Sequence, residues 1–327
     1  MSLHTFITQK VDVAIMECGI GGEYDATNVI SDPRVCAITS LGIDHQALLG
    51  QSLPEIAWHK AGIMKNGVVC VSAPQREDAL QVLRERSVER SAVLVEIADE
   101  TVEALKNGKI VVGLKGAHQY VNAAVAVRVC QEWVEKFGKS GNDEGKSVIG
   151  SDDAVKTGLE SAQWPGRAQT LKFEEEFGDQ VVFYFDGAHT PESLTVCGEW
   201  FDTVLKSESG RNSDELLRPL TKVAQPFSHV IFCSNDSNKV VNASNTNFTV
   251  AKDKSQKVQL GNKESWERVS KGTQHEFAQV HMFDYVDEAL AVAAAKNHGG
   301  NKITRVLVTG SMHLIGSVLT RCGAEML

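Results

Sequence analysis

The stretch that decides the fold contains VDVAIMECGIGGEYDATNVI, then GIDHQALLG, then AWHKAGIMK, and lies between Val11 and Lys65. Glu17 follows the apolar run Val11–Met16, His45 follows a second apolar run, and Lys60 lies on a short predicted helix. In α/β proteins, ligands bind at the carboxyl ends of parallel strands. We therefore expect an acid, an imidazole and an amine to gather at one edge of a parallel sheet, where metal and phosphate chemistry takes place.

Short runs rich in β-branched residues alternate with helical patterns through the first part of the chain. Such runs are typical of buried parallel strands, and the alternation predicts a doubly wound α/β sheet. The expected strands are Val11–Met16, Val35–Thr39, Val68–Ser72 and Val93–Ile97, and the expected helices are Leu53–Ile63, Arg76–Arg90 and Ala117–Phe137.

A polar, glycine- and serine-rich segment, Gly138–Asp153, is predicted to be a loop, and a short helix, Ala154–Ala162, follows it. We place the domain boundary after this helix, which gives domains over residues 1–162 and 163–327. A second, smaller Rossmann-like α/β domain is expected, with Asn235–Gln274 as a polar insertion. Its predicted strands are Val181–Phe185, His229–Ser234 and Arg305–Thr309, and its predicted helices are Pro191–Leu205 and Val286–Lys296.

Composition narrows the class of protein. The chain has 327 residues, 42% hydrophobic residues and a net charge of −9, which favours two globular domains and argues against a basic nucleic-acid-binding protein. No apolar run approaches the roughly 20 residues that span a bilayer. The seven cysteines form no C-x-x-C pair, so buried reduced thiols are expected. These features predict the cytosol, with a mitochondrial form as an alternative.

The residues around Glu17 allow three interpretations. A carboxylate at the end of a strand can bind Mg²⁺, and the glycines of GIGG at 19–22 allow a tight turn beside it. A plain glycine turn with a surface acid explains the same letters. A dinucleotide loop fits less well, because G-I-G-G-E-Y departs from G-x-G-x-x-G. The run D-A-T-N at 25–28 is expected to cap a helix or form an Asx turn.

Other motifs carry similar pairs of interpretations. His45 is either a structural histidine or a ligand that Asp44 orients. Arg167, in WPGRAQ, is either a surface arginine or a bidentate phosphate ligand. Asp186 ends a strand in DGAHTPES, and Pro191 begins a helix. The motif VTGSMHLIG at 308–316 is interpreted as a buried strand and turn without a chemical role.

These motifs together resemble the central and C-terminal domains of the Mur ligase superfamily, and most closely the eukaryotic, fungal-like folylpolyglutamate synthases. The resemblance covers nearly the whole chain from Val11. It implies a Mur-ligase-type doubly wound sheet, N-terminally truncated, followed by the smaller glutamate-ligase domain. It also implies an ATP-dependent, amide-bond-forming ligase that adds L-glutamate to the γ-carboxylate of tetrahydrofolate polyglutamates through an acyl phosphate.

The resemblance also assigns roles to residues. Glu17, His45 and Lys60 match metal ligands for Mg²⁺, and Lys60 matches a lysine that CO₂ carbamylates. Asn122, Arg167 and Asp186 match ATP-binding residues. By the same resemblance, Lys60 and His189 are the expected catalytic residues. The expected partners are tetrahydrofolate polyglutamate and L-glutamate. A monomer is expected, and neither nucleic acid nor a membrane is expected as a partner.

One expected motif is missing. No G-x-x-x-x-G-K-[ST] phosphate loop occurs in the sequence, and the nearest text, GNDEGKS at Gly141–Ser147, is one residue short and carries two acids. Two alternatives to the ligase therefore stay open. The chain is a catalytically silent remnant that binds nucleotide or a partner, or it is a dinucleotide-binding oxidoreductase, which NAD(P)H titration would detect.

Overall fold

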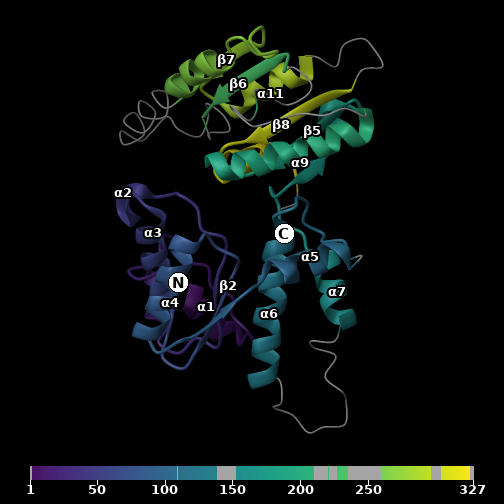
Figure 1. Cartoon of the computed structure of the whole chain (residues 1–327). Coiled ribbons are helices and arrows are strands. Elements are labelled where there is room, and N and C mark those ends of the chain that lie inside the picture. The colour runs from purple at the N-terminus through teal and green to yellow at the C-terminus, as the bar shows by residue number, and fades with distance from the viewer. Residues whose placement is uncertain are drawn as a thin grey trace. The chain divides into compact units, whose positions relative to one another are not determined.

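The chain folds as two compact units in a computed structural model (Figure 1). The first unit comprises Met1–Val111 and Tyr120–Leu159, and the second comprises Val112–Gln119 and Glu160–Leu327. The second unit therefore includes a short stretch that precedes the long helix of the first. The structure describes residues 2–108, 110–137, 152–209, 220, 227–234, 259–295 and 303–324.

The sheet of the first unit has three parallel strands in the order β1 (Cys36–Ile38), β2 (Val69–Ser72) and β3 (Val93–Glu96). The central strand β2 is buried along its whole length, as expected for a parallel strand that is covered on both faces. The three strands confirm the predictions made from three of the β-branched runs.

The helices of the first unit follow the predicted alternation. In α3, Ser52 and Glu55 form a capping box, in which each side chain accepts a hydrogen bond from the other residue's backbone N–H. Of the predicted loop Gly138–Asp153, only residues 152 and 153 are described, and they belong to α7. The segment GNDEGKS lies wholly outside the described residues. The helices are α1 (Ser2–Gln9), η1 (Ala26–Val29), α2 (Gln46–Leu49), α3 (Leu53–Lys60), η2 (Ala61–Ile63), α4 (Glu77–Glu89), α5 (Asp99–Asn107), α6 (Gln119–Phe137) and α7 (Asp152–Ser161).

Two hydrophobic cores cover the two faces of this sheet. On one face, Cys70 packs with residues of α3 and α4, including Ala57 and Leu83. On the other face, Val71 packs with residues of α5 and α6, including Val102 and Ala124. Helices on both faces of a parallel sheet are the doubly wound arrangement that the sequence predicts.

The predicted first strand, Val11–Met16, is wrong. The segment has no regular structure, and Ile15 is 91% exposed. A short apolar run becomes a strand only where a neighbouring strand satisfies its backbone groups. Among the described residues, β1 pairs with β2 alone, so Val11–Met16 does not join the sheet.

In the second unit, β5 (Val181–Asp186) pairs with β8 (Thr304–Thr309) in parallel and with β4 (Gln169–Leu171) in antiparallel orientation. A separate parallel pair joins β6 (His229–Cys233) to β7 (Gln279–Phe283). The sequence predicted β5, β6 and β8. It missed β4 and β7, because QTL and QVHMF are short and carry little β-branched character of their own.

The helices of the second unit include one inside the predicted insertion Asn235–Gln274. Residues 259–269 are helical, because Trp266 is buried against Phe227 and anchors an otherwise polar segment. The sequence did not predict this helix within the polar insertion, and residues 235–258 lie outside the described part. The other helices are α8 (Glu174–Phe177), α9 (Pro191–Ser209), α11 (Val286–Ala295) and α12 (Met312–Arg321).

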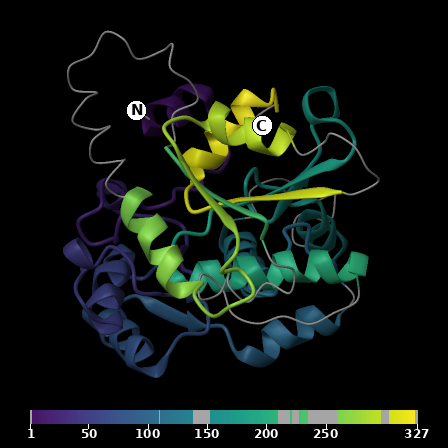
Figure 2. The same cartoon turned by 90° about the horizontal axis from the view of Figure 1, so that it is seen from above.

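Strand β5 pairs with β8, the yellow strand in Figure 2, and packs on both of its faces. Phe183 and Phe185 face a core formed with α11 and α12, whereas Tyr184 faces Trp200 and Phe201 of α9. The alternation buries both faces of β5 and leaves Asp186 at its carboxyl end. The core therefore fixes the position of a carboxylate at the edge of the sheet.

Two further findings concern the composition. All seven cysteines are free thiols; Cys36, Cys70 and Cys197 are buried, whereas Cys130 is exposed, so the expectation of burial is wrong for that residue. Burial raises the pKa of Cys36 to about 11, which keeps its thiol protonated.

Among the described helices, none is both long and apolar enough to cross a bilayer.

Candidate functional site

The glycine loop (residues 19–28) is organised by one carboxylate. Asp25 accepts hydrogen bonds from the backbone N–H groups of Gly19, Ile20 and Thr27, at 2.9 to 3.0 Å, and from the Thr27 hydroxyl at 2.6 Å. These bonds, led by that of the Thr27 side chain, lower the pKa of Asp25 to about 2. Asp25 is the N-cap of η1, which confirms the cap predicted from D-A-T-N.

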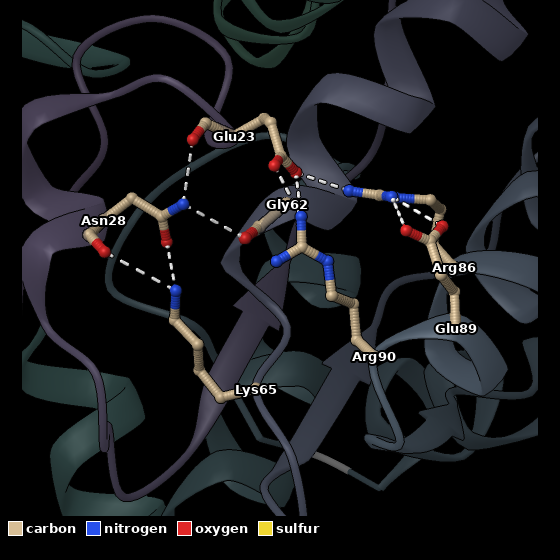
Figure 3. Close-up of polar contacts among 7 residues, drawn as sticks. All are labelled: Glu23, Asn28, Gly62, Lys65, Arg86, Glu89 and Arg90. Carbon is tan, nitrogen blue, oxygen red and sulfur yellow. Dashed lines mark hydrogen bonds and ion pairs between the residues drawn. The ribbon is translucent and has the colours of Figure 1, made fainter.

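Charged side chains attach the glycine loop to α4 (Figure 3). The carboxylate of Glu23 accepts hydrogen bonds from both Arg86 and Arg90, and Arg86 also binds Glu89 at 2.6 Å. The Arg86 guanidinium lies 4.3 Å from the ring centroid of Trp58. The side chain of Arg86 is only 4% exposed and that of Glu23 15%, so this ion pair is largely removed from water.

A second set of contacts attaches the end of the glycine loop to the segment after α3 (Figure 3). The Asn28 amide donates to the carbonyl oxygens of Glu23, at 2.9 Å, and Gly62, at 3.2 Å. Its Oδ1 accepts from the Lys65 ammonium at 2.7 Å. The sequence missed both sets, since the partners of Glu23 lie 63 and 67 residues away.

Two glycines allow three segments to meet. A Cβ at Gly21 would lie 2.8 Å from Cδ2 of Leu49 on α2, and a Cβ at Gly22 would lie 2.9 Å from the carbonyl oxygens of His59 and Lys60. The backbone of the glycine loop therefore lies directly against α2 and the end of α3. The glycine loop, which follows Glu17 in the sequence, thus lies against the elements that contain Leu49 and Lys60.

The predicted ligands themselves differ in environment. Glu17 is exposed and makes no hydrogen bond or ion pair with another described residue. His45 is the N-cap of α2 and has a left-handed backbone (φ 51°), and its Nε2 lies 3.5 Å from Oδ2 of Asp44. Lys60 ends α3, is half-buried, and has no carboxylate partner in the described part of the chain.

Within the described ranges, protein side chains alone form no metal centre. Across the residues that the structure describes, no three His, Cys, Asp or Glu side chains are arranged to hold an ion. The roles of Glu17, His45 and Lys60 as ligands therefore stay predictions.

In the second unit, Asp186 joins two loops, residues 164–168 and 187–190. Its carboxylate accepts the N–H groups of Ala168 and Ala188, both at 3.0 Å. The N–H of Gly187 donates to the carbonyl of Gly166 at 3.0 Å, which closes the same junction. Asp186 thus shapes the site through the backbone, a role that the sequence did not predict.

Two predicted functional side chains lie on these loops. Arg167 is exposed, and its Nη1 lies 3.2 Å from the position that a Cβ of Gly187 would take. Its guanidinium has no carboxylate partner among the described residues, as a phosphate ligand requires. Nδ1 of His189 lies 3.1 Å from the carbonyl oxygen of Gly187, so Nδ1 carries a proton, and the tautomer of the neutral ring has its lone pair on Nε2. The structure therefore brings Arg167, Asp186 and His189 together.

The motif at 308–316 holds the loop 187–190 from the opposite side. The carbonyl oxygen of Ala188 accepts from Gly310 N–H at 2.9 Å and from the Thr309 hydroxyl at 3.4 Å. Met312 packs on Gly187, where a Cβ would lie 2.1 Å from its Sδ, and on Gly166, where a Cβ would lie 3.2 Å from its Cε. The predicted strand and turn are confirmed only over residues 308–311, because residues 312–316 begin the helix α12, which the sequence missed. The motif also positions the site loops.

Asn122, the remaining predicted nucleotide ligand, lies on α6 in the first unit, whereas Arg167 and Asp186 belong to the second. Its contact with a nucleotide stays a prediction. The sequence also missed His118, which immediately precedes α6 and belongs to the second unit.

Known proteins are similar to this chain in sequence and in fold, although no protein-family model matches it. Mitochondrial folylpolyglutamate synthase of Bos taurus is 36% identical over 301 residues, 82% of this chain and 50% of the relative. The probable folylpolyglutamate synthase of Schizosaccharomyces pombe is 35% identical over 344 residues, 97% of this chain and 64% of the relative. The chain thus spans about half the length of the bovine protein.

Solved structures agree with these relatives in fold. Mycobacterium tuberculosis folylpolyglutamate synthase complexed with ADP has a TM-score of 0.65 at 21% identity, over 99% of this chain and 70% of that one. An FPGS–AMPPCP–folate complex has a TM-score of 0.60 at 21% identity, over 98% of this chain and 68% of that one. On the sequence identity over most of its length and on the shared fold, this chain belongs to the folylpolyglutamate synthase family.

Proposed function

We propose that this chain is an ATP-dependent ligase that adds L-glutamate to the γ-carboxylate of tetrahydrofolate polyglutamates. The observation that carries the proposal is the loop cluster around Asp186. The exposed guanidinium of Arg167 has no carboxylate partner in the described part of the chain, and it lies on the same loop cluster as His189. One carboxylate, that of Asp186, holds these loops together. Relatives named folylpolyglutamate synthase supply the reaction class.

The proposed reaction joins two anions and therefore needs positive charge. An oxygen of the folate γ-carboxylate attacks the γ-phosphorus of ATP, the bond to the β-γ bridging oxygen breaks, and ADP leaves. The amine of glutamate then attacks the acyl carbon, the C–O bond to phosphate breaks, and the amine loses a proton. Catalysis of such steps consists mainly of positioning and charge neutralisation.

The residues of the second unit are suited to parts of this work. Arg167 would bind phosphate oxygens in bidentate fashion. His189, with its lone pair on Nε2, would accept the proton that the attacking amine releases. Asp186 would keep Arg167 and His189 in place, because its carboxylate holds the backbone on which both are carried.

The first unit offers donors that fit Mg²⁺. This ion keeps several waters and binds one or two carboxylates together with substrate phosphates, so the exposed carboxylate of Glu17 and the ring of His45 would hold it without a closed protein cage. Mg²⁺ would supply charge neutralisation at the phosphates. Lys60, which is half-buried and has no carboxylate partner among the described residues, is the proposed site of carbamylation by CO₂.

A direct assay tests the proposal. The purified chain is incubated with ATP, MgCl₂, tetrahydrofolate diglutamate and L-glutamate, and the folate products are resolved by mass spectrometry. The expected result is a product longer by one glutamate, formed with stoichiometric ADP and lost in Arg167→Ala. ADP binding without chain extension would favour the silent nucleotide-binding protein. Neither extension nor ADP binding would overturn the assignment.

A further inference from the structure

His118 lies in the second unit near the residues that the proposed function uses. It belongs to Val112–Gln119, the stretch that packs with the second unit although it precedes α6. The charges that act on its ring are those of Asp186, Arg167 and Glu199. His118 therefore lies within electrostatic reach of the proposed phosphate ligand and of the carboxylate that shapes the loops.

The hydrogen bonds of His118 define its tautomer. The amide nitrogen of Gln119 lies 2.9 Å from Nε2 of the His118 ring, and an amide nitrogen can only donate. Nε2 therefore accepts, and the neutral ring carries its proton on Nδ1. Nδ1 is buried and has no hydrogen-bond partner among the described residues. A buried donor without an acceptor is uncommon and costs free energy, which an acceptor from a ligand would recover.

Gly116 keeps a side chain away from this donor. A Cβ at position 116 would lie 2.7 Å from Cε1 and 2.9 Å from Nδ1 of His118, but 3.9 Å from Nε2. It would therefore press on the Nδ1 edge of the ring. Gly116 also has a φ of +106°, which disfavours an L side chain. The glycine backbone therefore packs closely against the Nδ1 edge of the ring, with no side chain of its own there.

The charge state of His118 suits a hydrogen-bond donor that is not a cation. Burial lowers the pKa of His118, Arg167 lowers it further, and Asp186 and Glu199 act in the opposite direction. Arg167 supplies the positive charge in this cluster, and a neutral imidazole beside it supplies a directed N–H without charge repulsion.

We propose that His118 is a nucleotide-binding residue whose Nδ1–H donates to a phosphate oxygen of the nucleotide that Arg167 binds. The proposal rests on the proposed function, because that function places a nucleotide in this cluster. A hydrogen bond between a neutral donor and an anionic oxygen is strong enough that its loss weakens binding by about ten- to a hundredfold.

Two substitutions distinguish the contribution of the Nδ1 donor from that of the rest of the His118 ring. The amide nitrogen of asparagine reproduces Nδ1, whereas that of glutamine reproduces Nε2. Dissociation constants for Mg·ADP are measured by calorimetry for the full chain, His118→Asn, His118→Gln and the control His4→Gln, which replaces an exposed histidine of α1. We expect His118→Gln to bind about ten- to a hundredfold more weakly, and His118→Asn and His4→Gln to stay within about threefold of the parent chain.

The outcomes are distinguishable. Unchanged affinity in His118→Gln, or equal losses in both His118 variants, overturns the role of Nδ1. A parent chain that does not bind ADP contradicts the proposed function instead. A measurement on the parent chain avoids dependence on variant folding: in ¹⁵N-histidine spectra, ADP should shift the His118 Nδ1 resonance downfield, and an unmoved resonance with ADP bound would reject the proposal.

Discussion

The glycine loop of the first unit and the loops around Asp186 in the second are held by different forces. A largely buried ion-pair cluster and a hydrogen bond from a cation hold the glycine loop: Glu23 pairs with Arg86 and Arg90, and the Lys65 ammonium donates to Asn28. Backbone hydrogen bonds, one carboxylate and a thioether hold the loops at Asp186. The first arrangement uses its cations for structure, whereas the second leaves the cation of Arg167 without a carboxylate partner among the described residues.

The difference distinguishes arginines that stabilise the fold from an arginine that can bind a ligand. A cation that is already paired with a buried carboxylate has little to offer a phosphate, so Arg86 and Arg90 are structural despite their charge. An exposed guanidinium on a loop fixed by its backbone can bind an anion without losing a partner. The two regions therefore respond differently to substitution, in stability in one case and in ligand binding in the other.

The largest expected effect is on the buried ion pair. Glu23→Ala removes the buried carboxylate that Arg86 and Arg90 share, and it leaves the 4%-exposed side chain of Arg86 with only the exposed Glu89 as a partner. Loss of a buried ionic partner costs about 3–5 kcal/mol. Urea unfolding measures the loss. Glu89→Gln is the matched control, because Glu89 is 59% exposed, and its effect should stay below about 1 kcal/mol. Equal losses of stability in Glu23→Ala and Glu89→Gln would contradict the claim that the buried partner of Arg86 matters more than the exposed one.

The next effect is on the junction at Asp186. Asp186→Ala leaves the N–H groups of Ala168 and Ala188 without acceptors, at a cost of about 2–4 kcal/mol in the free energy of unfolding, and it also weakens ADP binding. Chemical denaturation and calorimetry measure the two losses. Asp179→Ala, at an exposed acid of the same unit, should change neither by more than about 0.5 kcal/mol. A stable Asp186→Ala would show that the loops hold without the carboxylate.

Packing at Gly187 should have a smaller effect. Gly187→Ala places a Cβ 2.1 Å from Sδ of Met312, and this overpacking costs about 1–3 kcal/mol. Adding Met312→Ala removes the clash, so the double variant should lose less than the sum of the single losses in urea unfolding. Gly158→Ala, in the interior of α7 with open space around it, is the control and should stabilise slightly. Strict additivity would indicate that Met312 does not hold the loop.

The smallest effect is a pH dependence of the glycine loop. The pKa of Asp25 falls from 3.8 to about 2 on folding, so its stabilisation is present above pH 3.8 and disappears as the pH falls through about 2. Because Asp25 is partly exposed, screening reduces this contribution to about 1 kcal/mol. The stability difference between the parent chain and Asp25→Ala should therefore shrink from pH 5 to pH 2. A constant difference would reject this role of Asp25.

Local patterns in the sequence predicted much of the fold and some of the site. Val69–Ser72 and Val181–Asp186 are apolar enough to indicate strands by themselves, and Asp186 follows from its place at a strand end. The sequence could not predict what depends on distant partners. Nothing near Glu23 points to Arg86, and nothing near Gly187 points to Met312.

Errors in the prediction have the same origin. Val11–Met16 has the composition of a strand but no strand beside it in the described chain, and residues 259–269 are polar yet become helical because Trp266 is buried. Tertiary contacts determine the structure of both segments: the first lacks the partner that a strand needs, and the second gains a buried contact that stabilises a helix. Local propensity indicates which segments can form strands or helices, and the available partners decide whether they do.

The most direct test of the central claim is calorimetric titration of Mg·ADP into the parent chain and Arg167→Ala. Arg167 is exposed and has no carboxylate partner in the described residues, so its removal should leave the unfolding midpoint unchanged. The account predicts ADP binding by the parent chain and at least about tenfold weaker binding by Arg167→Ala. Equal affinities in two equally stable proteins would contradict the assignment of this loop cluster to the nucleotide.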